Sequence, residues 1–276
     1  MMISHHLFRL AIYILAVSAL ATAADAPREL RVCSDPDNMP FSNNKQEGFE
    51  NKIAELVAKD LHARLQYVWA AQTPVMVKQT LNANKCDLLI GAPAQWSPVL
   101  TTKPYYVSTY VFVYWKNKHK FGSFDDPELH RLKIGLTAVA SGGSNPPPAY
   151  ALADRGLNAN IVGFPIYPAT KIFEAVATGS VDTAIVWGPV GGYFAKKQRL
   201  AITPVSPSEQ DNSLRFNFEM SMGVRWSDSS FKDELDKVLD RRRTQINKIL
   251  EAYGVPLLPL DTVSEEQTKL VSTTSK

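Results

Sequence analysis

Short apolar runs alternate with stretches of helical periodicity through the first part of the chain. Ile53, Leu56, Val57 and Leu61 recur at the spacing of one helix face, whereas LRVCS is a short continuous apolar run. The elements that these patterns predict are strand 30–34, helix 49–61, strand 65–69, helix 73–83 and strand 87–91. Strands joined by helices in this order predict a parallel sheet.

Two long apolar stretches interrupt this order. YVSTYVFVYW at 106–115 is β-branched and aromatic without clear alternation, which predicts a strand buried on both faces. FNFEMSMGVRW at 216–226 predicts a second long strand. Between them the α/β pattern starts again, with strands at 132–137, 160–164 and 181–187 and helices at 147–156, 168–179 and 189–198. A last helix is predicted from Ser227-Asp228, as the cap, to about Tyr253.

This order predicts an α/β protein with two Rossmann-like lobes joined by two hinge strands. We expect lobe 1 to contain residues 24–112 and 218–276, and lobe 2 to contain residues 113–217. Clefts between lobes, over the carboxyl ends of parallel strands, are preferred ligand sites. The most economical interpretation is a binding protein.

The N-terminus predicts export. His5, His6 and Arg9 precede an uncharged run that ends in Ala21-Thr22-Ala23, which is typical of a secretory signal peptide at residues 1–23, cleaved near Ala23. A run of roughly fifteen residues is short for a membrane span, so an uncleaved anchor is the less favoured alternative. No later stretch is long and apolar enough to cross a membrane. We therefore expect a periplasmic protein that is not membrane-spanning and is monomeric on its own.

Charge and cysteine content narrow the picture. Without Arg9, 29 basic and 27 acidic side chains remain, so there is no basic footprint for nucleic acid. Cys33 and Cys86 both lie in the exported part, where a pair of cysteines predicts a disulfide. Two buried thiols are the alternative, because Cys33 ends its predicted strand while Cys86 precedes its own, and bridged Cα atoms must lie within about 7 Å.

Catalysis is the rival class of function. Only His62, His119 and His130 remain after signal removal, and none is spaced as a metal pair. CxxC, HExxH and CxxCH motifs are absent, so the sequence predicts no metal site, no cofactor and no enzyme. Glu174 and Asp182 are the one candidate acid pair, and a helix surface and a strand start account for them.

Several segments resemble a known family. LRVCSDPDNMPFS, GFENKIAELVAKDL and TTKPYYVSTYVFV are similar to the binding loop, first helix and hinge strand of the family-3-type extracellular solute-binding proteins of ABC transporters. That resemblance implies the type II periplasmic binding protein fold. NKCDLLIG, SNPPPAYALADRGL and RRRTQINKILEAYGVPLLPL further resemble a subgroup encoded alongside quinoprotein methanol dehydrogenases, the MxaJ/MoxJ and XoxJ type. This narrower resemblance implies an accessory role in binding, maturing or activating a PQQ-dependent methanol dehydrogenase.

The resemblance also bears on the ligand. Amino-acid binders of the family carry an arginine in the loop before FSxPY and an acid after the last strand of lobe 2, and here Gln95 and Trp187 stand there. An amino acid is therefore not expected. Pyrroloquinoline quinone, with three carboxylates, would need several basic side chains, and Lys103 is the obvious one near the cleft. Cofactor carriage is not favoured.

The side chains left for the cleft are polar-neutral or aromatic, with one acid. They are Asp35, Asn38, Phe41, Gln95, Trp96, Ser97, Tyr105, Ser141, Ser144, Asn145 and Trp187. They fit a docking surface with Trp96, Tyr105 and Trp187 as anchors, or a small neutral polar solute delivered to a permease. The aromatic residues equally fit simple interlobe packing, and Asp35 and Asn38 fit an Asx turn.

Overall fold

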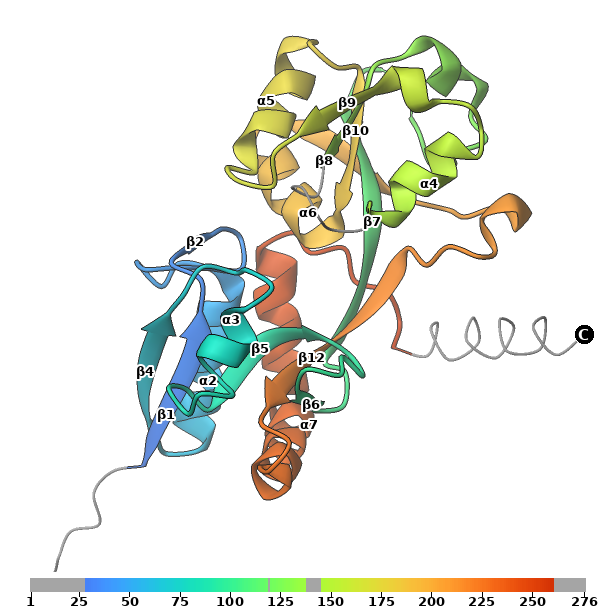
Figure 1. Cartoon of the computed structure of the whole chain (residues 1–276). Helices are drawn as coiled ribbons and strands as arrows, with labels where there is room; N and C mark the ends of the chain where they lie inside the picture. The colour runs from blue at the N-terminus through green and yellow to red at the C-terminus, as the bar shows by residue number, and fades with distance from the viewer. Residues whose placement is uncertain (1–27, 119, 138–144, 261–276) are drawn as a thin grey trace, which may run out of the picture.

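The computed structural model describes residues 28–118, 120–137 and 145–260 (Figure 1). The predicted signal peptide, with its cleavage near Ala23, lies outside the described residues, as do Ser141 and Ser144. In Figure 1 the two α/β lobes lie one above the other, and the long strands β7 and β12 run between them.

The first lobe is built on a sheet in the order β4-β1-β5-β12. β1 pairs in parallel with β4 and β5, and β12 is antiparallel to β5. The elements are β1 (Glu29–Ser34), α2 (Phe49–Asp60), β4 (Arg64–Trp69), β5 (Leu88–Pro93), β12 (Asn217–Val224) and α7 (Ser229–Ala252). The core packs apolar side chains of α2 and α7, such as Phe49, Ile53 and Leu235, against the sheet. The last helix predicted from the sequence is therefore confirmed as α7, and one of its faces belongs to this core.

The second lobe repeats this architecture. β10 and β9 both pair in parallel with β8, and β11 pairs antiparallel with β7. Its elements are β8 (Ile134–Thr137), α4 (Pro147–Ala153), β9 (Ile161–Phe164), α5 (Thr170–Thr178), β10 (Thr183–Trp187), α6 (Gly188–Lys197) and β11 (Leu200–Pro204). β11 was not predicted, because LAITP lies among polar and turn-forming residues.

β7 (Tyr106–Trp115) connects the two sheets. Residues 106–109 pair with β12, and from Tyr110 onward the partners are β10 and β11. All residues of β7 except Tyr110 and Trp115 are buried, which confirms the strand predicted to be covered on both faces. The lobe boundaries expected at 112/113 and 217/218 stay a prediction. The point in β7 where the pairing strand changes from β12 to β10, between residues 109 and 110, lies close to the first of these boundaries.

Short elements complete the described chain. They are β2 (Asp37–Asn38), β3 (Ser42–Asn43), α3 (Met76–Gln79), β6 (Leu100–Thr101) and three 3-10 helices, Pro127–Arg131, Asn158–Asn160 and Glu209–Asp211.

The helix predicted at 73–83 was wrong in length, since only α3 is helical. Thr80 ends it by donating its hydroxyl to the carbonyl of Met76, and Asn84 takes a positive φ of 60°. Hydroxyl and amide side chains compete with helical backbone bonds in this way. The predicted cap of the last helix was also wrong in part. Asp228 occupies the N-cap position, but its carboxylate makes no cap hydrogen bond and pairs with Arg225 at 2.7 Å.

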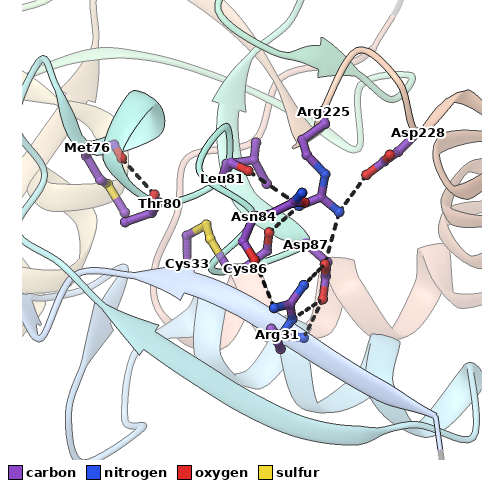
Figure 2. Close-up of a disulfide and its surroundings, with 10 residues drawn as sticks. All are labelled: Arg31, Cys33, Met76, Thr80, Leu81, Asn84, Cys86, Asp87, Arg225 and Asp228. Atoms are coloured by element: carbon purple, nitrogen blue, oxygen red, sulfur yellow. Dashed lines mark hydrogen bonds and ion pairs between the residues drawn. A yellow bond between two sulfur atoms is a disulfide. The ribbon is translucent and has the colours of Figure 1, made fainter.

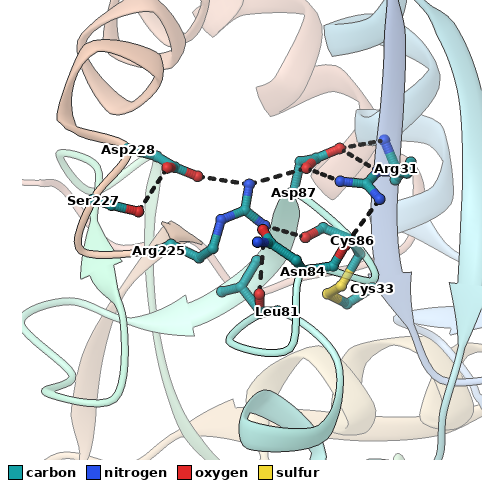
Figure 3. Close-up of polar contacts among 9 residues, drawn as sticks. All are labelled: Arg31, Cys33, Leu81, Asn84, Cys86, Asp87, Arg225, Ser227 and Asp228. Carbon is teal, nitrogen blue, oxygen red and sulfur yellow. Dashed lines mark hydrogen bonds and ion pairs between the residues drawn. A yellow bond between two sulfur atoms is a disulfide. The ribbon is translucent and has the colours of Figure 1, made fainter.

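The predicted disulfide is confirmed. Cys33 and Cys86 are bridged with their Cα atoms 5.6 Å apart (Figure 2). Cys86 lies two residues before β5, so the parallel register that argued against a bridge does not extend to it. Next to the bridge, Asp87 lies between Arg31 and Arg225, and Arg225 continues to Asp228 (Figure 3). This polar chain joins β1 and the start of β5 to the segment before α7.

Candidate functional site

A cavity of about 470 Å³ lies between the lobes. The first lobe contributes the end of β1, the loop after it and the start of α2, while the second contributes β10 and the segment before α5. Tyr110 of β7 and Met220 of β12 line it from the connecting strands. The cavity therefore has the position expected for the ligand site of a two-lobed protein.

Four of the predicted cleft residues line this cavity: Asp35, Asn38, Phe41 and Trp187. Asp35 also builds the loop after β1, because its carboxylate accepts from the backbone N–H of Asp37 at 2.8 Å and of Gln72 at 2.6 Å. The Asn38 amide donates to Gln72 Oε1 at 2.6 Å. Asp35 and Asn38 therefore both stabilise the loop after β1 and line the cavity.

The loop between β5 and β6 does not contribute to the cavity. Gln95, Trp96 and Ser97 are exposed and are absent from its lining. The carbonyl of Ser97 instead accepts from the indole N–H of Trp226 at 3.1 Å. The expectation that this loop provides ligand contacts is not supported by its placement.

Two further predicted residues also differ from expectation. Tyr105 cannot be an exposed anchor, since only 4% of it is accessible and its hydroxyl donates to the carbonyl of Ile90 at 3.2 Å. Asn145 is exposed and does not line the cavity, although its neighbour Pro146 does. Residues such as Tyr105, just before a strand, have side-chain directions that the sequence pattern does not determine.

Glu50 is the charged residue of the described cavity lining that sequence analysis missed. It lies in the first turn of α2, and Oε1 occupies the space in front of the Cα of Gly91 on β5, so that any Cβ at that position would collide with it. Among the described residues its carboxyl has no hydrogen-bond donor or cation as a partner. Burial, together with the nearby charge of Asp35, raises the pKa of Glu50 to about 8. The signal in the sequence was an acid directly after the binding loop, in GFE.

The lining is otherwise apolar and aromatic. Trp187 packs edge-on against Tyr110 at 5.6 Å between ring centroids and against Phe218 at 5.7 Å. It therefore serves interlobe packing and lines the cavity as well. Asp35 and Glu50 are the acids of the described lining, which includes no Lys, Arg or His. Such a site repels carboxylates and favours neutral or cationic molecules.

Comparison with known proteins places the chain in a family. The profile of the bacterial extracellular solute-binding proteins, family 3, matches residues 30–256. Protein MoxJ of Methylorubrum extorquens is 31% identical over 88% of this chain and 87% of its own.

Two solved structures are also similar. The periplasmic binding protein XoxJ of Methylobacterium extorquens AM1 is 35% identical, with a TM-score of 0.69 over 83% of this chain and 99% of that one. MxaJ of Methlophaga aminisulfidivorans is 26% identical, with a TM-score of 0.72 over 83% and 100%. Within the part of the chain that the structure describes, no helix is both long and apolar enough to span a membrane. With its two α/β lobes of the type II periplasmic binding protein fold, the chain belongs to the family-3 bacterial extracellular solute-binding proteins.

Proposed function

We propose that this protein is a non-catalytic periplasmic binding protein that serves as an accessory factor for a PQQ-dependent methanol dehydrogenase, in its binding, maturation or activation. The observation that carries the proposal is similarity to MoxJ and XoxJ along most of the chain. The segments that resemble components encoded alongside quinoprotein methanol dehydrogenases support it. The cavity adds to this support, since its described lining includes no basic side chain for the carboxylate of an amino acid.

A tryptophan pair on the first lobe, Trp96 and Trp226, offers a docking surface for the dehydrogenase. Trp226 is 62% exposed and Trp96 is 38% exposed, and the bond from the Trp226 indole to Ser97 holds the two loops together. Tryptophan is enriched among residues that dominate protein–protein affinity. Trp96 stays a proposed anchor, and Trp226 takes the place of Tyr105 and Trp187, because Tyr105 is buried and Trp187 lines the cavity.

The test is binding of the mature protein to a methanol dehydrogenase purified from the same organism, measured by surface plasmon resonance. The Trp96→Ala/Trp226→Ala variant should bind about tenfold or more weakly, since an anchor residue contributes about 2 kcal/mol. Trp115→Ala is the matched control, because Trp115 is 37% exposed but lies at the end of β7. If the unmodified protein does not bind the dehydrogenase, the accessory role is wrong. If the double variant binds as tightly as the unmodified protein, the docking surface lies elsewhere.

Delivery of a small solute to a permease is the second candidate, and the interlobe cavity is the observation that favours it. Native mass spectrometry of the protein from its own periplasm separates the two proposals. A small bound mass without a dehydrogenase subunit supports the transport receptor, and a complex with the subunit supports the accessory factor.

A further inference from the structure

The cavity contains a carboxyl group that nothing in the described protein satisfies. Glu50 reaches the cavity from the first turn of α2. Its backbone N–H donates to the carbonyl of Phe41 at 2.9 Å, which holds this turn against the loop after β1. We infer that the cavity binds a small organic ammonium ion that carries no carboxylate, with Glu50 as its counter-ion. This inference goes beyond the accessory role, since the tryptophan pair lies outside the cavity.

The charges of the lining favour a cation. Asp35 contributes a second carboxylate, but its two oxygens already accept backbone N–H groups, so Glu50 is the acid left for a ligand. The described lining offers no Lys, Arg or His to balance them. A ligand with a carboxylate would add a negative charge to a site that holds two acids and whose described lining has no cation, and burying an unpaired charge is costly. A simple ammonium ion avoids this cost.

The aromatic side chains favour an alkylated cation. Phe41, Tyr110, Tyr167 and Trp187 line the same cavity as Glu50. Aromatic faces attract ammonium groups through their quadrupole, and alkyl substituents on nitrogen make apolar contacts with the same walls. Ile185 and Val190 extend these walls in the second lobe. The volume of about 470 Å³ lies within the range of small-molecule sites.

Glycine at position 91 makes the arrangement feasible. Any side chain there would push the Glu50 carboxyl away, because a Cβ would overlap Oε1. The Cβ of any other residue at position 91 would fill the space that the Glu50 carboxyl now occupies. A Gly91→Ala variant therefore tests the position of Glu50 without changing any charge.

The protonation of Glu50 gives a second readout. The groups around it are acids or phenols, namely Asp35, Tyr67, Tyr105, Tyr106 and Tyr167. With its pKa at about 8, Glu50 is mostly protonated at neutral pH. A quaternary ammonium ion favours the ionised carboxylate, so its binding should release a proton. Affinity should then rise with pH up to about 8, by at most roughly tenfold per pH unit, and level off above it.

The experiment is isothermal titration calorimetry of the mature protein with two probes of the same shape and different charge, choline and its neutral isostere 3,3-dimethylbutan-1-ol. Glycine betaine adds a carboxylate to the same head group. We expect choline to bind about tenfold or more tightly than either. Glu50→Gln should lose about tenfold or more of choline affinity and the proton release, and Gly91→Ala should weaken binding as well. Glu55→Gln, on the exposed side of α2, is the control.

Three results would overturn the inference. They are equal binding of choline and its neutral isostere, normal choline binding by Glu50→Gln, and no binding of choline at millimolar concentration. Affinity that falls above pH 8 for a neutral probe would instead show that protonated Glu50 donates to a neutral ligand. None of these results affects the proposed docking of the dehydrogenase, which is measured on a different surface.

Discussion

At the scale of single residues, the Asp87 carboxylate is shared by two arginines near the disulfide. It accepts from Arg31 Nη2 at 2.6 Å and from Arg225 Nη2 at 3.0 Å (Figure 3). Burial alone would raise the pKa of Asp87, but the hydrogen bonds from the two guanidinium groups outweigh it and hold the pKa below its usual value. Asp87→Asn should lower the free energy of unfolding at neutral pH by about 2 kcal/mol, because two half-buried guanidinium groups lose their shared counter-charge. Urea unfolding measures this.

The pH dependence follows from the direction of that shift. A carboxyl with a lowered folded pKa contributes its full stability above the pKa of the unfolded chain and loses it as pH falls through the folded value. The unmodified protein should therefore lose stability more steeply below about pH 4 than Asp87→Asn does. Asp233→Asn is the control, since Asp233 is exposed and pairs with Lys232 on the surface. Parallel acid profiles for the unmodified protein and Asp87→Asn would contradict this role.

The residues of the cavity show what sequence alone could find. Asp35 was predicted from its place in the loop after the first strand, and strand ends meet at one edge of a sheet. Trp187 was predicted from the family resemblance, because it stands where amino-acid binders carry an acid. Glu50 was missed because acids in the first turn of a helix are commonly there to balance the helix dipole. Its function as a cavity residue depends on Gly91, which is distant in sequence and close only after folding.

At the scale of elements, the disulfide joins the end of β1 to the chain that enters β5. The two cysteines are separated by 53 positions, so the bridge closes a long loop of the unfolded chain. Loop-closure entropy for that separation predicts that the Cys33→Ser/Cys86→Ser variant loses about 4 kcal/mol of stability. The measurement is the urea midpoint with and without dithiothreitol.

Reductant should lower the midpoint of the unmodified protein and leave the double variant unchanged. A double variant as stable as the bridged protein would show that the strands and the neighbouring Arg31–Asp87 pair fix this corner by themselves.

Prediction of elements succeeded for the long apolar patterns and for short strands such as β1 and β4, and it was wrong in length for the helix at 73–83. β7 and α7 each carry an extended apolar pattern, and both were found with nearly their observed bounds. The helix at 73–83 was overestimated because Thr80, Asn82 and Asn84 offer competing side-chain and turn geometry. Apolar periodicity sets the face of a helix, but local polar bonds set where it ends.

At the scale of the whole molecule, the second lobe contacts the first at α6 and the end of α7. The Cα of Gly192 on α6 lies so close to the carbonyl of Gly254 that no Cβ fits between them. Tyr193 stacks on Tyr253 with 5.8 Å between ring centroids, and the Tyr253 hydroxyl donates to the carbonyl of Glu47. The sequence predicted two lobes but not this contact, because PVGGYF gives no sign of which backbone it meets.

Gly192→Ala should separate the two lobes, because the new methyl group would overlap the carbonyl of Gly254. That carbonyl belongs to the backbone, so it cannot move aside as the end of a flexible side chain could. We expect a larger radius of gyration in small-angle X-ray scattering and a loss of about 2 kcal/mol in stability, the usual cost of overpacking. Gly122→Ala is the control, since the nearest atom to its new methyl group is Thr203 Cγ2 at 3.6 Å, an ordinary contact. The cavity is formed by both lobes, so Gly192→Ala should also weaken any ligand held between them. An unchanged radius of gyration would mean that β7 and β12 set the lobe arrangement without this contact.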